Sequence, residues 1–348
     1  MKTKHKNIPI FIPHMGCPNQ CVFCNQRSIS GRKSFDAGRV RQEIETALAT
    51  LPQDAETEIA YFGGSFTGID RELMLSLLRT AQDFVDAGRV SAIRLSTRPD
   101  YLSEEILELL SHYSVRHIEL GLQSMSDRVL AACRRGHTAE QARWACRAVK
   151  AAGFSLVGQM MIGLPESTPD AEEATAREIC ALGADAARIY PTVVFYDTPL
   201  CALAEAGDYT PLSCEEAAKR SARALRILCE RGVPCIRIGL CASEELVSPE
   251  TVYAGPNHPA LGELVWNAYY FDEVRTLLAR EKLLGRRVIL SVPEKAYSKV
   301  IGQHRANLSR WREETGTEIC RVIADKKTNE IRVFPEEYRN LKEEQPCI

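Results

Sequence analysis

The sequence has no long apolar run and no apolar stretch near its amino terminus. Residues 1–10 carry lysines but lack the apolar core of a secretory signal, and no segment approaches about eighteen uncharged apolar residues. We therefore expect a cytoplasmic protein without a membrane span. The chain also lacks a strong net charge, which is −2 over its 348 residues. Its 45% hydrophobic and 26% charged content is typical of a globular protein with a large core and gives no sign of disorder.

A fourth neighbouring cysteine is also missing. Cys17, Cys21 and Cys24 form a C-x3-C-x2-C pattern that offers three thiolates. Iron-sulfur clusters are held by Cys thiolates at short spacings, and a 4Fe-4S cluster with three protein ligands keeps one iron open to another group. A structural zinc site needs four ligands and would have only His14 nearby to complete the set. Inert buried thiols are the other alternative, and the spacing favours the cluster.

The remaining ten cysteines are scattered through expected helices and strands, as is typical of reduced thiols in a reducing compartment. Cys229, Cys235 and Cys241 recur every six residues. That spacing matches no local ligand pattern, so we interpret them as core thiols.

Short apolar runs alternate with amphipathic segments along the chain, which is typical of a parallel sheet. The expected strands are Pro9–Pro13, Glu58–Phe62, Ala92–Thr97, His117–Gly121, Ser155–Ile162, Ala187–Pro191 and Pro234–Ile238. The expected helices are Gly38–Leu51, Asp70–Ala87, Ser103–Leu110, Ala139–Ala152, Pro169–Leu182 and Ser213–Arg231. Ser103, Thr138 and Ser213 are expected helix N-caps. Six or seven βα units favour a whole or partial barrel over a doubly wound sheet.

Polar motifs follow successive expected strands. They are the cysteine loop, Gly63-Gly64-Ser65-Phe66-Thr67, Ser96-Thr97-Arg98-Pro99-Asp100, Gln123-Ser124 and, within and after the fifth strand, Gln159 with Gly163-Leu164-Pro165-Glu166. The carboxyl ends of parallel strands meet at one edge of the sheet, where active sites lie. A tandem glycine there lets a ligand approach bare backbone. The sequence therefore predicts a site at this edge.

These motifs resemble the radical S-adenosylmethionine (SAM) superfamily, and more narrowly the radical SAM half of the Elongator catalytic subunit. The resemblance runs from about residue 7 to residue 270. It rests on the cysteine loop and on YFGGSFTGI (61–69), STRPDYL (96–102), IELGLQS (118–124), RRGHT (134–138), IGLPEST (162–168), IYPTVV (189–194) and GPNHPALGELV (255–265).

The resemblance implies an α/β fold, a partial TIM-like (βα)6 barrel of the radical SAM type. It implies that Cys17, Cys21 and Cys24 hold a 4Fe-4S cluster whose free iron binds SAM. The reduced cluster would cleave SAM to a 5′-deoxyadenosyl radical, with ferredoxin or flavodoxin as a possible electron donor. By the same resemblance, the expected SAM-binding residues are Gly63, Gly64 and Ser65 at the methionyl amino group, and Ser96, Thr97, Gln123, Arg135 and Gln159 around the ribose and carboxylate.

Several other side chains have expected positions. Glu119 alternates with apolar neighbours, so we expect it to face the barrel interior and to contact a ligand or an arginine. Arg98 and Arg135 could clamp a carboxylate. Tyr190 and Tyr196 could line a substrate entrance, although aromatic packing is the preferred interpretation.

The carboxyl-terminal region has a different pattern. From Arg286 we expect the order β-α-loop-α-β-β, which resembles a KH module with the loop Gly302-Gln303-His304-Arg305 in the place of its GxxG loop. Residues 282–312 contain eight Lys or Arg and one acid. This local charge predicts a polyanion site on an α+β KH-like subdomain. The candidate RNA-binding residues are Arg286, Arg287, Lys299, Gly302, Arg305, Arg310 and Arg312.

The sequence thus predicts a radical SAM barrel over residues 1–256 and an extension over residues 257–348, with the KH-like part at about 286–334. The leading hypothesis is a radical SAM enzyme that modifies RNA, and specifically tRNA. The sequence after residue 265 is too short for the acetyltransferase half of the Elongator catalytic subunit, so we do not expect that half here. One alternative is a small-molecule substrate, as in oxygen-independent coproporphyrinogen oxidase. The other is an RNA-binding protein with a non-catalytic iron-sulfur cluster.

Overall fold

The structure, a computed structural model, describes residues 5–13, 15–17, 21–26, 34–52, 56–240, 248 and 250–337. His14, considered above as a zinc ligand, and Cys241, interpreted above as a core thiol, lie outside these ranges. No helix within the described ranges is long and apolar enough to cross a bilayer.

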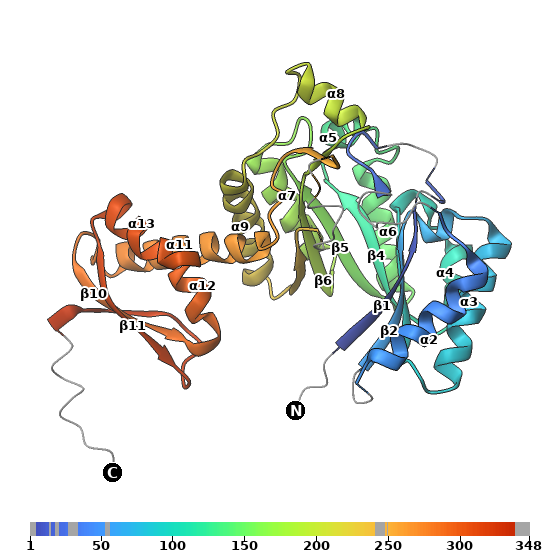
Figure 1. The fold of residues 1–348 in the computed structure, drawn as a ribbon, viewed down its shortest axis with the longest axis horizontal. Coiled ribbons are helices and arrows are strands. Elements are labelled where there is room, and N and C mark those ends of the chain that lie inside the picture. The colour runs from blue at the N-terminus through green and yellow to red at the C-terminus, as the bar shows by residue number, and fades with distance from the viewer. Residues whose placement is uncertain are drawn as a thin grey trace, which may run out of the picture. The chain divides into compact units, whose positions relative to one another are not determined.

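Seven parallel strands form one sheet in the order β1-β2-β3-β4-β5-β6-β8 (Figure 1). The strands are β1 (His5–Ile12), β2 (Glu56–Gly63), β3 (Ala92–Thr97), β4 (Val115–Gln123), β5 (Ser155–Ile162), β6 (Ala186–Pro191) and β8 (Cys235–Ile238). The connecting helices are α2 (Val40–Thr50), α3 (Arg71–Asp86), α4 (Glu104–Ser111), α5 (Asp127–Ala132), α6 (Ala139–Ala151), α7 (Pro169–Ala181), α8 (Pro199–Glu205) and α9 (Cys214–Glu230). Six βα units precede a seventh strand, so the predicted partial barrel is confirmed. A short antiparallel pair, β7 (Val194–Phe195) with β9 (Val252–Ala254), lies beyond β6 in the chain.

The helices begin where the sequence indicates. The side chains of Ser103, Thr138 and Ser213 each accept a hydrogen bond from a backbone N–H in the first turn, which confirms the three predicted N-caps. Thr138 forms a full capping box, with Gln141 rather than Glu140 as its partner. These caps fix where each helix leaves the sheet.

Side chains alternate between the two faces of the sheet. On the convex face, Tyr61 donates from its hydroxyl to the carbonyl of Leu77 in α3 at 2.6 Å, and the side chains on this face are apolar and fully buried. On the concave face, the same strands carry Glu58, Arg94 and Glu119, which are also buried. A closed TIM barrel fills its interior with branched apolar side chains. This sheet instead borders an open chamber whose wall carries both charged and apolar side chains.

A second compact unit comprises Ala260–Ile348 with Ser221–Arg223, and the first comprises the rest of the chain. The second unit contains α11 (Leu261–Arg280), β10 (Arg287–Pro293), α12 (Tyr297–Ile301), α13 (Ala306–Thr315), β11 (Glu318–Asp325) and β12 (Arg332–Pro335). The strand order is β11-β10-β12, with β11 parallel and β12 antiparallel to β10. Trp311, fully buried, stacks on Phe271 in its core. The predicted element order is confirmed, whereas the KH assignment stays a prediction.

Candidate active site

One cavity of about 1690 Å³ runs along the concave face from β1 to β8. Its wall includes all three predicted cluster ligands and seven of the eight predicted SAM contacts. These lining residues are Cys17, Cys21, Cys24, Gly63, Gly64, Ser96, Thr97, Gln123, Arg135 and Gln159. Ser65 is the exception among the predicted residues, since its side chain is completely buried beside the cavity. The sheet therefore brings together residues that are up to 142 positions apart in the chain.

Of the three thiols of the cysteine loop, Cys21 is buried, and Cys17 and Cys24 are partly buried in the cavity wall. Burial raises the pKa of Cys17, and burial together with the charge of Cys21 raises the pKa of Cys24 to about 12. Such thiols ionise only when a cation stabilises the thiolate. Arg135 supplies one positive charge, because its Nη1 donates to Cys21 Sγ at 3.3 Å.

The donor set fits an iron-sulfur cluster. Within the described ranges, no three His, Cys, Asp or Glu side chains converge on the position of a single metal ion. The three thiolates of a 4Fe-4S cluster bind three different irons, so they do not need to converge on one point. Phe23, between two of the cysteines in sequence, is buried and packs with Cys21 in an apolar cluster, as expected for a residue that limits water at this site.

The tandem glycine has a structural reason that the sequence did not reveal. A Cβ on Gly64 would lie 1.9 Å from the carbonyl oxygen of Met15, and one on Gly63 would lie 2.7 Å from that of Ile12. Gly64 N also donates to the Ile12 carbonyl at 2.9 Å. The glycines thus let the start of the cysteine loop pack directly on the loop after β2. Their proposed contact with SAM stays a prediction.

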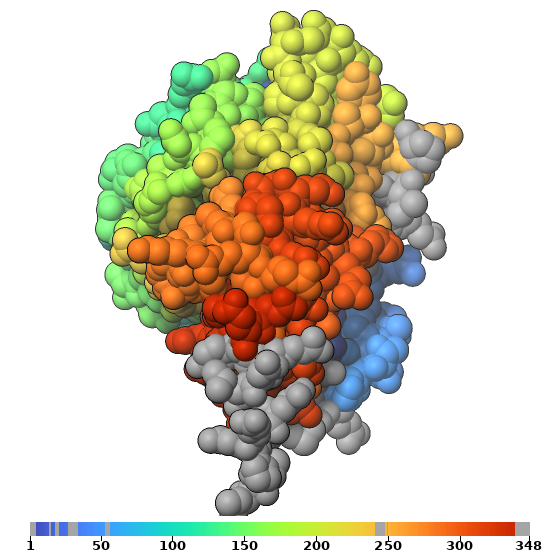
Figure 2. Space-filling model, turned by 90° about the vertical axis from the view of Figure 1, so that its left-hand side faces the viewer, coloured from blue at the N-terminus to red at the C-terminus, as the bar shows by residue number. Residues whose placement is uncertain are grey.

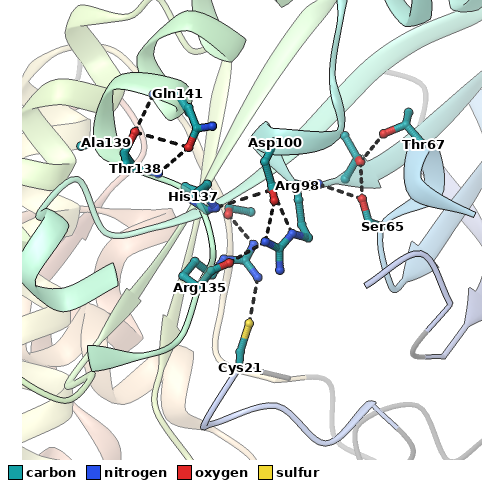
Figure 3. Close-up of polar contacts among 12 residues, drawn as sticks. Cys21, Ser65, Thr67, Arg98, Asp100, Arg135, His137, Thr138, Ala139 and Gln141 are labelled. Atoms are coloured by element: carbon teal, nitrogen blue, oxygen red, sulfur yellow. Dashed lines mark hydrogen bonds and ion pairs between the residues drawn. The ribbon is translucent and has the colours of Figure 1, made fainter. Parts of the chain in front are cut away.

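A hydroxyl network joins the loops after β2 and β3 (Figure 3). Ser65 Oγ lies 2.7 Å from Thr97 Oγ1, which lies 2.6 Å from Thr67 Oγ1. Ser65 Oγ also accepts a hydrogen bond from Arg98 N at 3.3 Å. Ser65 and Thr97 therefore hold two neighbouring loops in register, a role that sequence motifs alone did not indicate.

Arg98 and Arg135 lie side by side next to the cysteines (Figure 3). Arg98 binds Asp100 through Nε at 2.9 Å and Nη2 at 2.7 Å, and it donates to the Arg135 carbonyl at 2.5 Å. Burial alone would raise the pKa of Asp100, but Arg98 holds it below its usual range. Burial and the charge of Arg135 lower the pKa of His137 to about 4, so His137 is neutral. Among the described residues, neither the Nη1 of Arg98 nor the Nε of Arg135 has a hydrogen-bond partner, and both atoms are buried.

Two glutamines lie in the middle of the chamber wall. Gln159 Nε2 donates to Gln123 Oε1 at 3.4 Å, and Gln123 has a left-handed backbone with φ of 66°. This conformation costs energy in a non-glycine residue and often occurs at functional sites. Ser96, on β3, lines the same wall and donates to the Tyr61 carbonyl at 3.4 Å.

A buried ion network crosses the floor of the chamber. Glu119 Oε1 accepts from Arg94 Nη1 at 2.9 Å and from Arg188 Nη2 at 2.8 Å, which confirms that Glu119 faces inward and contacts arginine. Arg94 Nε also donates to Glu58 Oε2 at 3.0 Å. Burial opposes ionisation of Glu58, yet His117 and Arg94 hold its pKa at about 2.

Sequence reasoning missed most of this network. Arg94 and Arg188 are single charges inside otherwise apolar strands, AIRLST and AARIYP, and that pattern was the available signal. Tyr190 belongs to the chamber wall and accepts from Arg188 Nη1 at 3.2 Å, so the packing interpretation of Tyr190 was incomplete. Tyr196 does pack, edge to face, on Tyr253.

The candidate RNA-binding residues differ in their surroundings (Figure 2 shows one face of this unit in orange and red). Arg287 pairs with Glu318 at 2.9 Å and Glu336 at 2.6 Å, and Arg310 pairs with Glu314 at 3.0 Å. Their charges are therefore largely neutralised. Lys299 lies 4.4 Å from the centre of the Trp266 ring.

The remaining candidates are Arg286, Arg305, Arg312 and Gly302. The three arginines are exposed, and no ion pair forms on them within the described ranges. Gly302 is buried, and a Cβ on it would lie 3.2 Å from the backbone nitrogen of Asn307, a tight contact. Arg305 has a left-handed backbone with φ of 62°, so an arginine occupies a conformation that favours glycine. All of these RNA contacts stay predictions.

The chain matches two sequence models of one protein family. Residues 11–179 match the radical SAM superfamily and residues 184–270 match the radical SAM C-terminal domain. The two matches together cover most of the chain, including every residue placed in the cavity wall above from Phe11 onward.

Curated relatives and a solved structure agree with this match. The chain is 26% identical, over 91% of its length, to the tRNA uridine(34) acetyltransferase of Methanocaldococcus jannaschii and covers 64% of that protein. It is 28% identical to human Elongator complex protein 3, over 62% of its own length and 47% of the relative. The chain thus spans less than two thirds of these relatives. The structure of Methanocaldococcus infernus Elp3 has the same fold, with a TM-score of 0.60 and 21% identity over 82% of this chain and 66% of that chain.

Proposed function

Because the chain belongs to the radical SAM superfamily and is a radical SAM enzyme, we propose that it modifies RNA, and specifically tRNA. Members of the superfamily use a 4Fe-4S cluster and SAM. When bound, these two groups supply a 5′-deoxyadenosyl radical that removes hydrogen from a substrate. In our proposal Cys17, Cys21 and Cys24 hold the cluster.

One observation carries the RNA proposal: the similarity to the tRNA uridine(34) acetyltransferase extends over 91% of this chain. It therefore includes both the strands that form the chamber and the C-terminal unit. The exposed arginines of that unit supply positive charge, which is the general requirement for binding a polyanion. We also propose a cytoplasmic location and, because the proposed cleavage of SAM needs a reduced cluster, an electron donor of the ferredoxin or flavodoxin type. The proposal concerns the radical step and leaves the installed group open.

The residues around the cysteines have separable roles in this proposal. Arg135 stabilises negative charge at Cys21, and the contact of Gly64 with Met15 positions the cysteine loop against the sheet. Gln123 and Gln159 provide amide groups in the chamber for the ribose of SAM. Arg98, held by Asp100, keeps one free N–H group for a carboxylate.

The test is the release of 5′-deoxyadenosine by the reduced, cluster-loaded protein with SAM, with and without tRNA. We expect release that tRNA stimulates and that digestion of the tRNA abolishes. The Cys24→Ala variant should release none, whereas Cys229→Ala, a change at an exposed cysteine of α9, should behave as the wild type. Release that no RNA stimulates would refute the RNA proposal. Release that a small molecule stimulates instead would support the small-molecule alternative.

A further inference from the structure

Two arginines lie next to each other on the β6–β8 side of the chamber. Arg188 on β6 and Arg237 on β8 are register partners in a parallel pair. Neighbouring strands are about 4.8 Å apart, and both residues line the cavity. Like charges in this arrangement are unfavourable unless an anion compensates them.

The carboxylates of the protein compensate only part of this positive charge. Glu119 pairs with Arg188 but is shared with Arg94. No carboxylate in the described part of the chain forms an ion pair with Arg237, which lies in the chamber wall and is only partly exposed. Arg94 has Glu58 as a second partner, so two carboxylates serve Arg94 and Arg188, and Arg237 has none among the described residues.

The same place also has unused hydrogen-bond donors. The Nε of Arg188 is buried and has no hydrogen-bond partner among the described residues, and the side chain as a whole is only 10% exposed. The Tyr190 hydroxyl accepts from Arg188 and so keeps its own proton for another acceptor. Burial raises the pKa of Tyr190, which keeps that proton in place at neutral pH.

We propose that Arg188, Arg237 and Tyr190 form an oxyanion subsite that binds a phosphate group of the nucleotide substrate. Arginine is suited to this ligand because its planar fork of N–H groups matches two phosphate oxygens. The identification of the anion as a nucleotide phosphate rests on the proposed function.

The surroundings of the subsite suit a nucleotide. Phe62 lies under Arg188, with 5.4 Å between the guanidinium carbon and the ring centre, and Phe11 lies 6.2 Å from Phe62 between ring centres. Both rings line the cavity and offer an apolar face to a base. Gln159 is the register partner of Arg188 on β5, so the subsite adjoins the expected SAM position without sharing its residues.

Binding of uridine 5′-monophosphate and of uridine to the full-length, cluster-loaded protein without reductant tests the subsite. Calorimetry should show that the monophosphate binds at least about tenfold more tightly than the nucleoside, because a bidentate charged contact is lost with the phosphate. Arg237→Gln should remove this difference, and Arg237→Lys should keep part of it. Arg231→Gln, a change at an exposed arginine outside the chamber, should have no effect. Equal binding of both ligands, or unchanged binding in Arg237→Gln, would overturn the proposal.

Two further experiments test whether the arginines belong to the SAM site and distinguish failure of the subsite from failure of the RNA proposal. Displacement of the monophosphate by SAM in direct competition would assign the arginines to the SAM site and would overturn the subsite. If tRNA fails to stimulate 5′-deoxyadenosine release while monophosphate binding still depends on Arg237, the RNA proposal fails and the subsite stands for a free nucleotide. If tRNA stimulates Arg237→Gln as well as the wild type, the subsite fails and the RNA proposal stands.

Discussion

Arg94 and Arg188 on the concave face of the sheet are buried and paired with carboxylates, whereas several basic residues of the C-terminal unit are exposed and carry no ion pair in the described ranges. Arg94 and Arg188 share Glu119, so each guanidinium has a fixed position. Arg305 and Arg312 have no such partner. A fixed charge can select one chemical group, while an exposed charge contributes to a general field that attracts polyanions. Within the proposed function, we therefore propose that the chamber selects the substrate and that the C-terminal surface attracts RNA without sequence preference.

Loss of a cluster ligand should have the largest effect on the chamber. We expect Cys21→Ala to reduce bound iron and SAM cleavage to background, because it removes one of the three proposed cluster ligands and the one that accepts from Arg135. Iron analysis and chromatography of 5′-deoxyadenosine measure both quantities. Full iron content with normal cleavage in Cys21→Ala would show that the cluster is held elsewhere.

Removal of the buried carboxylate of Glu119 should cost more stability than removal of the exposed carboxylate of Glu105. Glu119→Ala leaves two buried arginines without their shared partner, and such a loss typically costs about 3–5 kcal/mol. Glu105→Ala, which breaks an exposed ion pair with Arg71, should cost about 0–1 kcal/mol. Urea unfolding of the two variants measures the difference. Equal costs would mean that the chamber network does not stabilise the fold.

The ionisation of Glu58 should make the stability of the folded protein fall at acidic pH. Its pKa is about 2 in the folded protein against an ordinary value of 4.5. The stabilisation is therefore complete above about pH 4.5 and is lost as the pH falls toward 2. Glu58→Gln should flatten the dependence of the melting temperature on pH in this window, and Glu108→Gln, at an exposed site of α4, should not. A parallel pH profile in wild type and Glu58→Gln would contradict the assigned charge state.

The C-terminal surface should show the smallest effects per residue. We expect Arg305→Ala and Arg312→Ala each to lower the slope of log affinity against log salt for tRNA by about 1, since each removes one phosphate contact. Arg287→Ala should change it less, because Glu318 and Glu336 already neutralise this arginine. Filter binding over a range of salt concentrations measures the slopes. A larger change of the salt slope in Arg287→Ala than in Arg305→Ala would contradict the prediction that the unpaired arginines contribute most to RNA binding.

The sequence predicted the seven strands of the large sheet and six of its helices because each has a strong local signal, but it did not predict α5, α8, α11 or the β7–β9 pair. The alternation around Glu119 and the N-caps of α4, α6 and α9 depend on neighbouring residues, and the structure confirms them. The cysteine spacing is equally local.

Contacts between distant segments could not be predicted in this way. The proximity of Arg188 and Arg237 depends on a register shift between β6 and β8. The need for Gly64 depends on where Met15 lies, 49 positions earlier. The charge count over residues 282–312 likewise could not show that Glu336 neutralises Arg287. Each of these facts requires knowledge of how strands pair in three dimensions.

Transfer of deuterium from RNA to the 5′-deoxyadenosine that forms from SAM tests the central claim most directly. The reduced, cluster-loaded protein is incubated with SAM and with tRNA isolated from cells grown on deuterated nucleosides, and the 5′-deoxyadenosine is analysed by mass spectrometry. The account predicts deuterium in the 5′-deoxyadenosine formed by the wild type and by Arg231→Gln, and a clear reduction in Arg237→Gln. Abundant 5′-deoxyadenosine without deuterium in the wild type would contradict it.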